Sequence, residues 1–182
     1  MGGLTTLPDD DDEFWNNADG FNLAWFVSEL TEQDMLRTLI RGHMHIEREL
    51  RSFIESRAPA PQHFRHQDHD YAATVRLALM LGLSEELKSP LLALGTLRNK
   101  FAHSLQMKFG DIEADQFYKT IGPELKAMAL SIYDEFRKER NLVEFKRQSA
   151  KDRLTWLLVG IFSTIWTDRK HPPPPIRTSV AT

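Results

Sequence analysis

Apolar residues recur at three- and four-residue intervals through most of the chain, which is the spacing of one buried face of an α-helix. The first long run covers about 31–57, with Thr31 as the expected helix cap and Pro59 following its end. Other runs predict helices over about 22–30, 71–81 with a stop at Gly82, 90–103 with Ser89 as its cap, 112–121, 123–140 and 150–167. With no strand pattern and no repeat, the sequence predicts an all-α fold, a single helical bundle domain.

The two ends of the chain lack this periodicity. Residues 1–21 carry glycines and five consecutive acids from Asp9 to Glu13, so we expect an acidic, flexible tail. Residues 171–182, after the helical domain of 22–170, include Pro172 to Pro175 and are expected to form a disordered, proline-rich tail.

Composition excludes several classes of function. The chain has 182 residues, 41% of them hydrophobic, which is enough for the core of one domain. Its net charge of −3 gives no global positive field, so direct DNA reading is not expected and an RNA contact would need a local patch. The absence of cysteine excludes disulfides, thiolate zinc sites and cysteine nucleophiles. We expect no cofactor.

The location of the protein is predicted from what its apolar segments can do. The start of the chain has neither the basic residues nor the apolar run of a secretory signal, so we expect a cytoplasmic protein. The most apolar window, 154–166, is shorter than the roughly 20 residues that a bilayer span needs. We therefore expect a buried helix there and no membrane contact.

A loop over 58–70 is rich in possible metal ligands. It contains three histidines and two aspartates, namely His63, His66, Asp68, His69 and Asp70. Imidazole and carboxylate bind zinc and similar ions, but the spacing is loose and no second cluster completes a site. Because Asp68 or Asp70 is well placed to cap the next helix, we predict no metal site.

The most unusual stretch lies near the end of the 90–103 helix, where Arg98, Asn99 and His103 occur within six residues of one another. Gly95, Asn99 and His103 are four residues apart and share one helix face. Glycine inside a helix costs about 1 kcal/mol relative to alanine, and the usual reason to keep it is the close approach of a backbone or a ligand. We therefore expect Asn99 and His103 to line a contact surface.

Arg98 lies on the more apolar side of the same helix, and a buried arginine needs an anion. Glu47 in the first long helix is itself in an apolar stripe, so we predict a buried or half-buried ion pair between Glu47 and Arg98. The nearby His43 is expected to be a satisfied core or boundary histidine.

These residue types also fit a chemical role. A histidine that titrates near neutrality can move a proton to or from a ribose hydroxyl, while an arginine stabilises charge that develops on a phosphate. On one ideal helix, however, Arg98 and His103 point about 140° apart, so they meet only if the helix kinks or if two copies of the chain come together. Purely structural roles, an ion pair and a helix-end group, remain open.

The sequence Arg98-Asn99, followed after three residues by His103, resembles the R-N-x-x-x-H motif of the HEPN superfamily. The order of segments is similar to that of the mannitol operon repressor family, on Arg41-Gly42 with Glu47, on 78–83, on 97–104 and on Asp152-Arg153-Leu154. The first resemblance implies helical domains that dimerise and often cleave RNA without a metal. The second implies an all-helical, dimeric domain that influences operon expression without a helix-turn-helix.

Two main hypotheses follow. The first is a transcription-related regulatory protein of the mannitol operon repressor type, a homodimer that acts through protein contacts rather than direct DNA reading, with RNA as an additional candidate partner. The alternative is a metal-independent RNA endonuclease of toxin or defence type, with His103 as acid or base, Arg98 as phosphate stabiliser and Asn99 as an orienting donor. A third, weaker hypothesis is a structural or toxin-neutralising interaction module.

Overall fold

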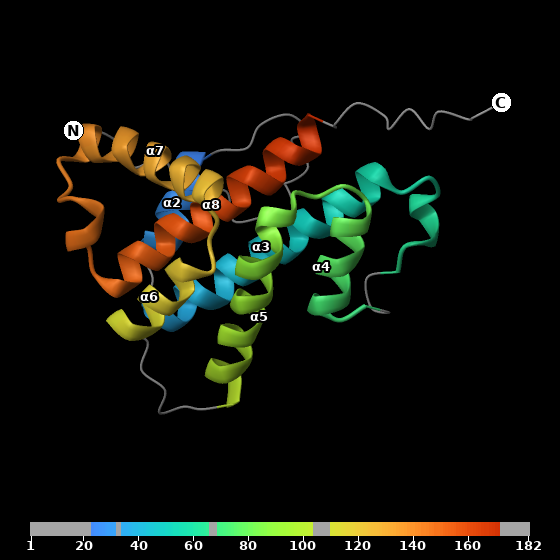
Figure 1. Ribbon diagram of the computed structural model, residues 1–182, viewed down its shortest axis with the longest axis horizontal. Coiled ribbons are helices and arrows are strands. Elements are labelled where there is room, and N and C mark those ends of the chain that lie inside the picture. Colours follow the sequence, from blue (N-terminus) through green and yellow to red (C-terminus); the bar gives the residue numbers. More distant parts are fainter. Residues whose placement is uncertain (1–22, 32–33, 66–68, 104–109, 172–182) are drawn as a thin grey trace, which may run out of the picture.

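A computed structural model describes residues 23–31, 34–65, 69–103 and 110–171 (Figure 1). Within these residues the chain forms seven α-helices and no strand, which confirms the predicted all-α bundle. The helices are α2 (Leu23–Thr31), α3 (Met35–Arg57), α4 (Tyr71–Met80), α5 (Lys88–His103), α6 (Asp111–Lys119), α7 (Pro123–Arg140) and α8 (Ala150–Lys170). The predicted acidic tail, 1–21, and all of the proline-rich tail except His171 lie outside the described residues.

The centre of the bundle is α8, whose side chains are buried almost without interruption from Leu154 to Ile165. It packs against α2, α3, α6 and α7, so its apolar residues have neighbours on nearly every side. The predicted buried helix is therefore confirmed. None of the described helices has the length and apolar character that crossing a membrane requires.

Two glycines allow the close packing around α8. A Cβ atom on Gly42 of α3 would lie 2.6 Å from Leu158 Cδ1, and one on Gly160 of α8 would lie 2.6 Å from the Ala129 Cβ of α7. Both distances are too short for real Cβ contacts. The helices can therefore come this close only because these positions carry no side chain.

Two predicted helix starts were wrong. Thr31 does not cap α3, because it ends α2 and its hydroxyl donates to the Val27 carbonyl at 2.9 Å. The cap is Asp34, whose Oδ1 accepts from the Arg37 backbone N–H at 2.9 Å. Likewise α5 begins at Lys88, so Ser89 is a residue of its first turn and not its cap.

Two of the cavities between the described helices matter for the site and share no lining residue. α4 and α5 pack against α3 and against each other, and a polar cavity, called the motif cavity below, lies between these three helices. α6 and α7 lie on the other side, against α8 (Figure 1). A second cavity, called the apolar cavity, lies between α6, α7 and α8.

Candidate functional site

The motif cavity has a volume of about 440 Å³ and receives side chains from three helices. It holds both of the residues predicted to form an ion pair, together with much of the predicted contact face of α5. Its main polar and aromatic lining residues are His43, Glu47, Tyr71, Arg98 and Asn99, and Gly95 contributes backbone. The structure thus brings Glu47, Arg98 and Asn99 to one site.

The guanidinium of Arg98 is not tied to a carboxylate. Arg98 is exposed, and its Nη1 donates to Asn99 Oδ1 at 3.1 Å. No ion pair links Arg98 to an acidic side chain of the described residues, so the predicted pair with Glu47 was wrong. Because a guanidinium has five N–H donors, most of them remain free to bind another group.

Glu47 has a partner on its own helix. Its Oε1 accepts a hydrogen bond from Arg51 Nη2 at 2.5 Å, one turn further along α3. Its Oε2 lies 3.7 Å from His43 Nδ1. Glu47 is half-buried, as the sequence predicted, but this local arginine neutralises it and the longer connection to α5 is not needed.

His43 is buried in the wall of the cavity, with only 4% of its surface exposed. Burial lowers the pKa of His43 from 6.5 to about 4, because a charged imidazolium would lose its hydration; the Glu47 carboxylate opposes this shift and Arg98 adds to it. The ring is therefore neutral at pH 7. Its Nε2 is sealed and has no hydrogen-bond partner, so the core position is confirmed but the expectation of a satisfied histidine was wrong.

The close approach predicted at Gly95 does occur, and a tyrosine ring makes it. A Cβ atom on Gly95 would lie 2.7 Å from Tyr71 Cδ1. The Tyr71 ring also contacts the His43 ring, with centroids 4.3 Å apart. Its hydroxyl is sealed without a partner, and burial, reinforced by Glu47, raises the pKa of Tyr71. Tyr71 was not among the predicted site residues, although Gly95 was a signal that another group packs against α5 at this point.

His103 is the last residue of α5, and its backbone is helical. The side chain of His103 and the following residues, 104–109, lie outside the described part of the chain. Gly95 and Asn99, which share one face of α5, both line the motif cavity. The place of the His103 imidazole in this site stays a prediction.

The histidine-rich loop has the capping role predicted for it. Asp70 Oδ1 accepts from the Ala73 backbone N–H at 2.7 Å and caps α4, while the His69 ring stacks on the Phe64 ring with centroids 5.4 Å apart. His66 and Asp68 lie outside the described residues. Among the residues that are described, no group of three histidine, aspartate or glutamate side chains is arranged to hold a metal ion.

Comparison of the sequence with protein-family models found no match, and comparisons with curated proteins and with solved structures found none either.

Proposed function

We propose that this chain is a metal-independent RNA endonuclease of the HEPN type, in which α5 binds the scissile phosphate beside the motif cavity. The observation that carries the proposal is the state of Arg98, which is exposed and bound to Asn99 rather than to a carboxylate. An arginine whose charge is not neutralised at a cavity rim is a ready partner for an oxyanion. Phosphate oxygens match the planar fork of its donors.

The surroundings favour an anion at this point. Of the two carboxylates that line the cavity, Glu47 is neutralised by Arg51 at 2.5 Å, and Asp70 accepts a backbone N–H as the cap of α4. His43 is buried and stays neutral at pH 7, because burial lowers its pKa to about 4. Asn99 holds one edge of the Arg98 guanidinium and leaves the other N–H groups for a ligand.

The reaction that these groups support is transesterification within RNA. The ribose 2′-oxygen attacks phosphorus and forms the P–O2′ bond, while the P–O5′ bond breaks. His103 takes the 2′ proton while water protonates the leaving 5′-oxygen, or His103 protonates that oxygen while water takes the 2′ proton. Arg98 stabilises the charge on the other phosphate oxygens. The products are a 2′,3′-cyclic phosphate and a 5′-hydroxyl.

The proposal includes a homodimer. α5 continues as an α-helix to His103. On such a helix Arg98 and His103 point about 140° apart, so we assign the two groups of one site to two copies of the chain. Mixing Arg98→Ala with His103→Ala protein then creates dimers with one intact site. In an equal mixture half of the dimers contain one copy of each variant, and each of these has one working site where the natural dimer has two. About a quarter of the activity of the natural protein is therefore expected to return.

Incubation of the full chain with a mixed RNA pool in the presence of a chelator tests the activity. Cleavage by the natural sequence and a loss of 100-fold or more in His103→Ala are expected, since general acid–base catalysis contributes about that much. His63→Ala, which changes an exposed histidine of the 3₁₀ turn Pro61–His63, is the matched control and should cleave normally. Cleavage that His103→Ala retains, or no cleavage by the natural chain, would contradict the proposal.

A second candidate function is regulation of the mannitol operon repressor type through protein contacts. It is favoured by the outer face of α3, where Leu36 is 46% and Met44 63% exposed beside Ile40. These residues line a groove of about 640 Å³ together with Arg37 and Arg41. Exposed apolar side chains bordered by charge are typical of a protein contact surface.

Transcript profiling distinguishes the two functions. Cells that carry the natural chain, Met44→Glu or Arg98→Ala are compared. The regulatory function predicts transcript changes that Met44→Glu abolishes and Arg98→Ala keeps. The opposite pattern, loss in Arg98→Ala alone, would favour the endonuclease.

A further inference from the structure

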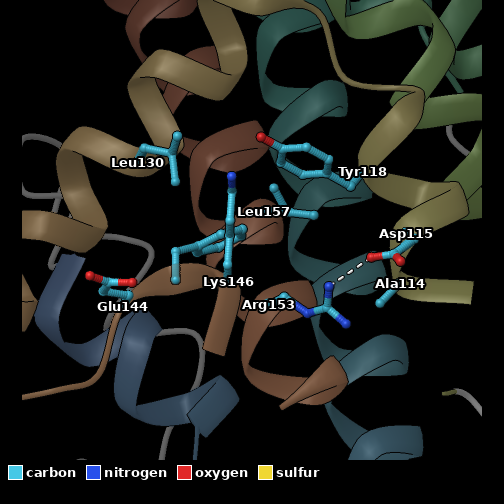
Figure 2. A pocket seen from close by; sticks show the side chains of 9 residues that line it. Ala114, Asp115, Tyr118, Leu130, Glu144, Lys146, Arg153 and Leu157 are labelled. Atoms are coloured by element: carbon cyan, nitrogen blue, oxygen red, sulfur yellow. Dashed lines mark hydrogen bonds and ion pairs between the residues drawn. The ribbon is translucent and has the colours of Figure 1, made fainter. Parts of the chain in front are cut away.

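The apolar cavity is larger than the motif cavity, at about 590 Å³, and the two share no lining residue. Its walls come from α6, α7, α8 and the 3₁₀ turn Phe145–Arg147 that precedes α8 (Figure 2). Sites for small molecules occupy roughly 300–1,000 Å³ and are mostly apolar with a few polar groups. The size and walls of this cavity fit that class.

Apolar side chains form most of the wall, and they come from different elements. They are Ala114 and Tyr118 of α6, Leu130 of α7, Phe145 of the 3₁₀ turn and Leu157 of α8. The Tyr118 and Phe145 rings lie with centroids 6.1 Å apart. A flat or branched apolar group would therefore meet aliphatic and aromatic carbon on several sides.

The Phe145 part of the wall is held in place by contacts with Tyr133. Phe145 packs edge-on against Tyr133, with centroids 5.6 Å apart. Tyr133 is fully buried, its hydroxyl donates to the Val143 carbonyl, and it accepts from Gln148 Nε2 at 2.7 Å. These bonds fix the segment between α7 and α8, so the cavity exists before any ligand enters and binding needs little reordering.

The charged side chains that line the cavity, Asp115 and Glu144 against Lys146 and Arg153, sum to zero, but they are unevenly paired. Arg153 donates to Asp111 at 2.5 Å and to Asp115 at 2.7 Å, as Figure 2 shows for Asp115. Glu144 lies 3.9 Å from Arg147. Lys146 also lines the cavity, but no acidic side chain of the described residues forms an ion pair with it. Lys146 is thus the lining cation without an ion-paired carboxylate, and its side chain is exposed.

A second lysine adds to the positive potential on this side. The Nζ atom of Lys126 lies 4.5 Å from the centre of the Tyr118 ring, and Tyr118 lines the cavity. Both lysines favour an anion over a cation or a neutral molecule. The apolar wall requires the rest of that anion to be hydrophobic.

We propose that the apolar cavity binds a small amphipathic monocarboxylate, with its aromatic or branched apolar body against Tyr118, Leu130 and Leu157 and its carboxylate paired with Lys146. This site is independent of the RNA-cleaving function proposed above. A second copy of the chain is the competing occupant, and a cavity that it filled would show no preference among an anionic, a neutral and a cationic form of one small molecule.

Three molecules with the same naphthalene body test the proposal: 1-naphthaleneacetate, 1-naphthaleneethanol and 1-naphthaleneethylamine. Each is titrated into the full-length protein at pH 7 while the methyl NMR signals of Leu130 and Leu157 are followed. The carboxylate is expected to shift both signals and to bind at least tenfold more tightly than the alcohol or the amine. Equal affinity for all three, or no shift of these methyl signals, would overturn the proposal.

Variants identify the carboxylate partner. Lys146→Ala is expected to weaken binding of 1-naphthaleneacetate about tenfold, Lys146→Arg to keep most of it, and Lys138→Ala, an exposed lysine elsewhere on α7, to leave it unchanged. Leu130→Trp should fill the cavity and abolish binding while the thermal unfolding midpoint stays close to that of the natural chain. Unchanged affinity in Lys146→Ala, or equal losses in Lys146→Ala and Lys138→Ala, would contradict the assignment.

Discussion

The motif cavity and the apolar cavity differ in how their polar groups are satisfied. In the apolar cavity, the Arg153 guanidinium bonds two aspartates through its terminal nitrogens and leaves only its Nε without a partner. In the motif cavity, His43 Nε2 and the Tyr71 hydroxyl are both sealed without partners, and Arg98 faces solvent without a carboxylate. The motif cavity thus holds two sealed, unpartnered polar atoms of uncharged side chains. In the apolar cavity the sealed atom without a partner belongs to an arginine that already bonds two carboxylates, and Lys146 is the cation without an ion pair among the described lining residues.

This difference indicates different uses. Unmet buried polar groups cost free energy, and they persist where a function or a tight packing constraint maintains them. The motif cavity therefore suits chemistry on a charged substrate, while the apolar cavity suits binding of a molecule that is mostly hydrocarbon. The following changes test the contrast, from the largest expected effect to the smallest.

The largest effect is expected from Gly95→Val. A Cβ at this position would lie 2.7 Å from Tyr71 Cδ1, so the ring would have to leave its place beside His43. Overpacking of this kind lowers the free energy of unfolding by about 3 kcal/mol. Thr96→Val, at the exposed next position of α5, should change it by less than about 0.5 kcal/mol.

Urea denaturation measures both variants. If Gly95→Val is as stable as Thr96→Val, the Tyr71 ring does not pack on α5 and the motif cavity does not have the wall described here.

A smaller effect is expected when the pH is lowered. The pKa of His43 is 6.5 when unfolded and about 4 when folded, so between these values the unfolded state binds more protons and stability falls as the pH falls. Between pH 7 and pH 5 this histidine should remove about 2 kcal/mol from the free energy of unfolding, with the loss complete below pH 4. The groups that face it are Glu47, Arg98 and Tyr71.

Denaturation of the natural chain and of His43→Leu at pH 7 and at pH 5 isolates the contribution of His43 to the free energy of unfolding. Glu49 and Asp168, whose pKa values are raised by burial, titrate in both proteins and cancel in the comparison. An equal pH dependence in the two proteins would show that His43 is not buried in its neutral form.

The smallest changes in stability are expected when one of two buried tyrosine hydroxyls is removed. Tyr133→Phe removes the donor to the Val143 carbonyl behind the apolar cavity and should cost about 1 kcal/mol. Tyr71→Phe removes a sealed hydroxyl that has no partner, so the stability should stay the same or rise slightly. A greater loss in Tyr71→Phe than in Tyr133→Phe, measured by thermal unfolding, would reverse the contrast between the cavities.

Much of the fold could be predicted because local chemistry determines it. α7 spans Pro123–Arg140 as predicted, since proline suits its first turn and Asn141 ends it in the left-handed conformation. Gly82 follows α4 with φ +96°, and Leu83 N–H donates to the Ala78 carbonyl at 3.0 Å. Thr31 does not cap α3 as predicted, because a threonine hydroxyl can also bond back into the helix that it ends.

The candidate site was harder to predict. The helical periodicity indicated that Glu47 and the Arg98–Asn99 pair lie close together, and all three line one cavity. It could not show that Arg51, one turn away on α3, would pair with the Glu47 carboxylate. Whether Glu47 pairs with Arg51 or with Arg98 depends on side-chain rotamers, which the spacing of residues in the sequence does not determine. Gly95 signalled a close approach, yet the approaching residue, Tyr71, lies on a helix whose position depends on the whole bundle.

The central claim is that the free guanidinium of Arg98 acts on an RNA phosphate, and the chemical ends of cleaved RNA test it most directly. A mixed RNA pool is treated in the presence of a chelator with the natural chain, with Arg98→Ala, or with Lys100→Ala as an exposed neighbouring control. The account predicts 2′,3′-cyclic phosphate ends from the natural chain and from Lys100→Ala, and at least 100-fold fewer from Arg98→Ala. Equal numbers of these ends from Arg98→Ala, or none from the natural chain, would contradict it.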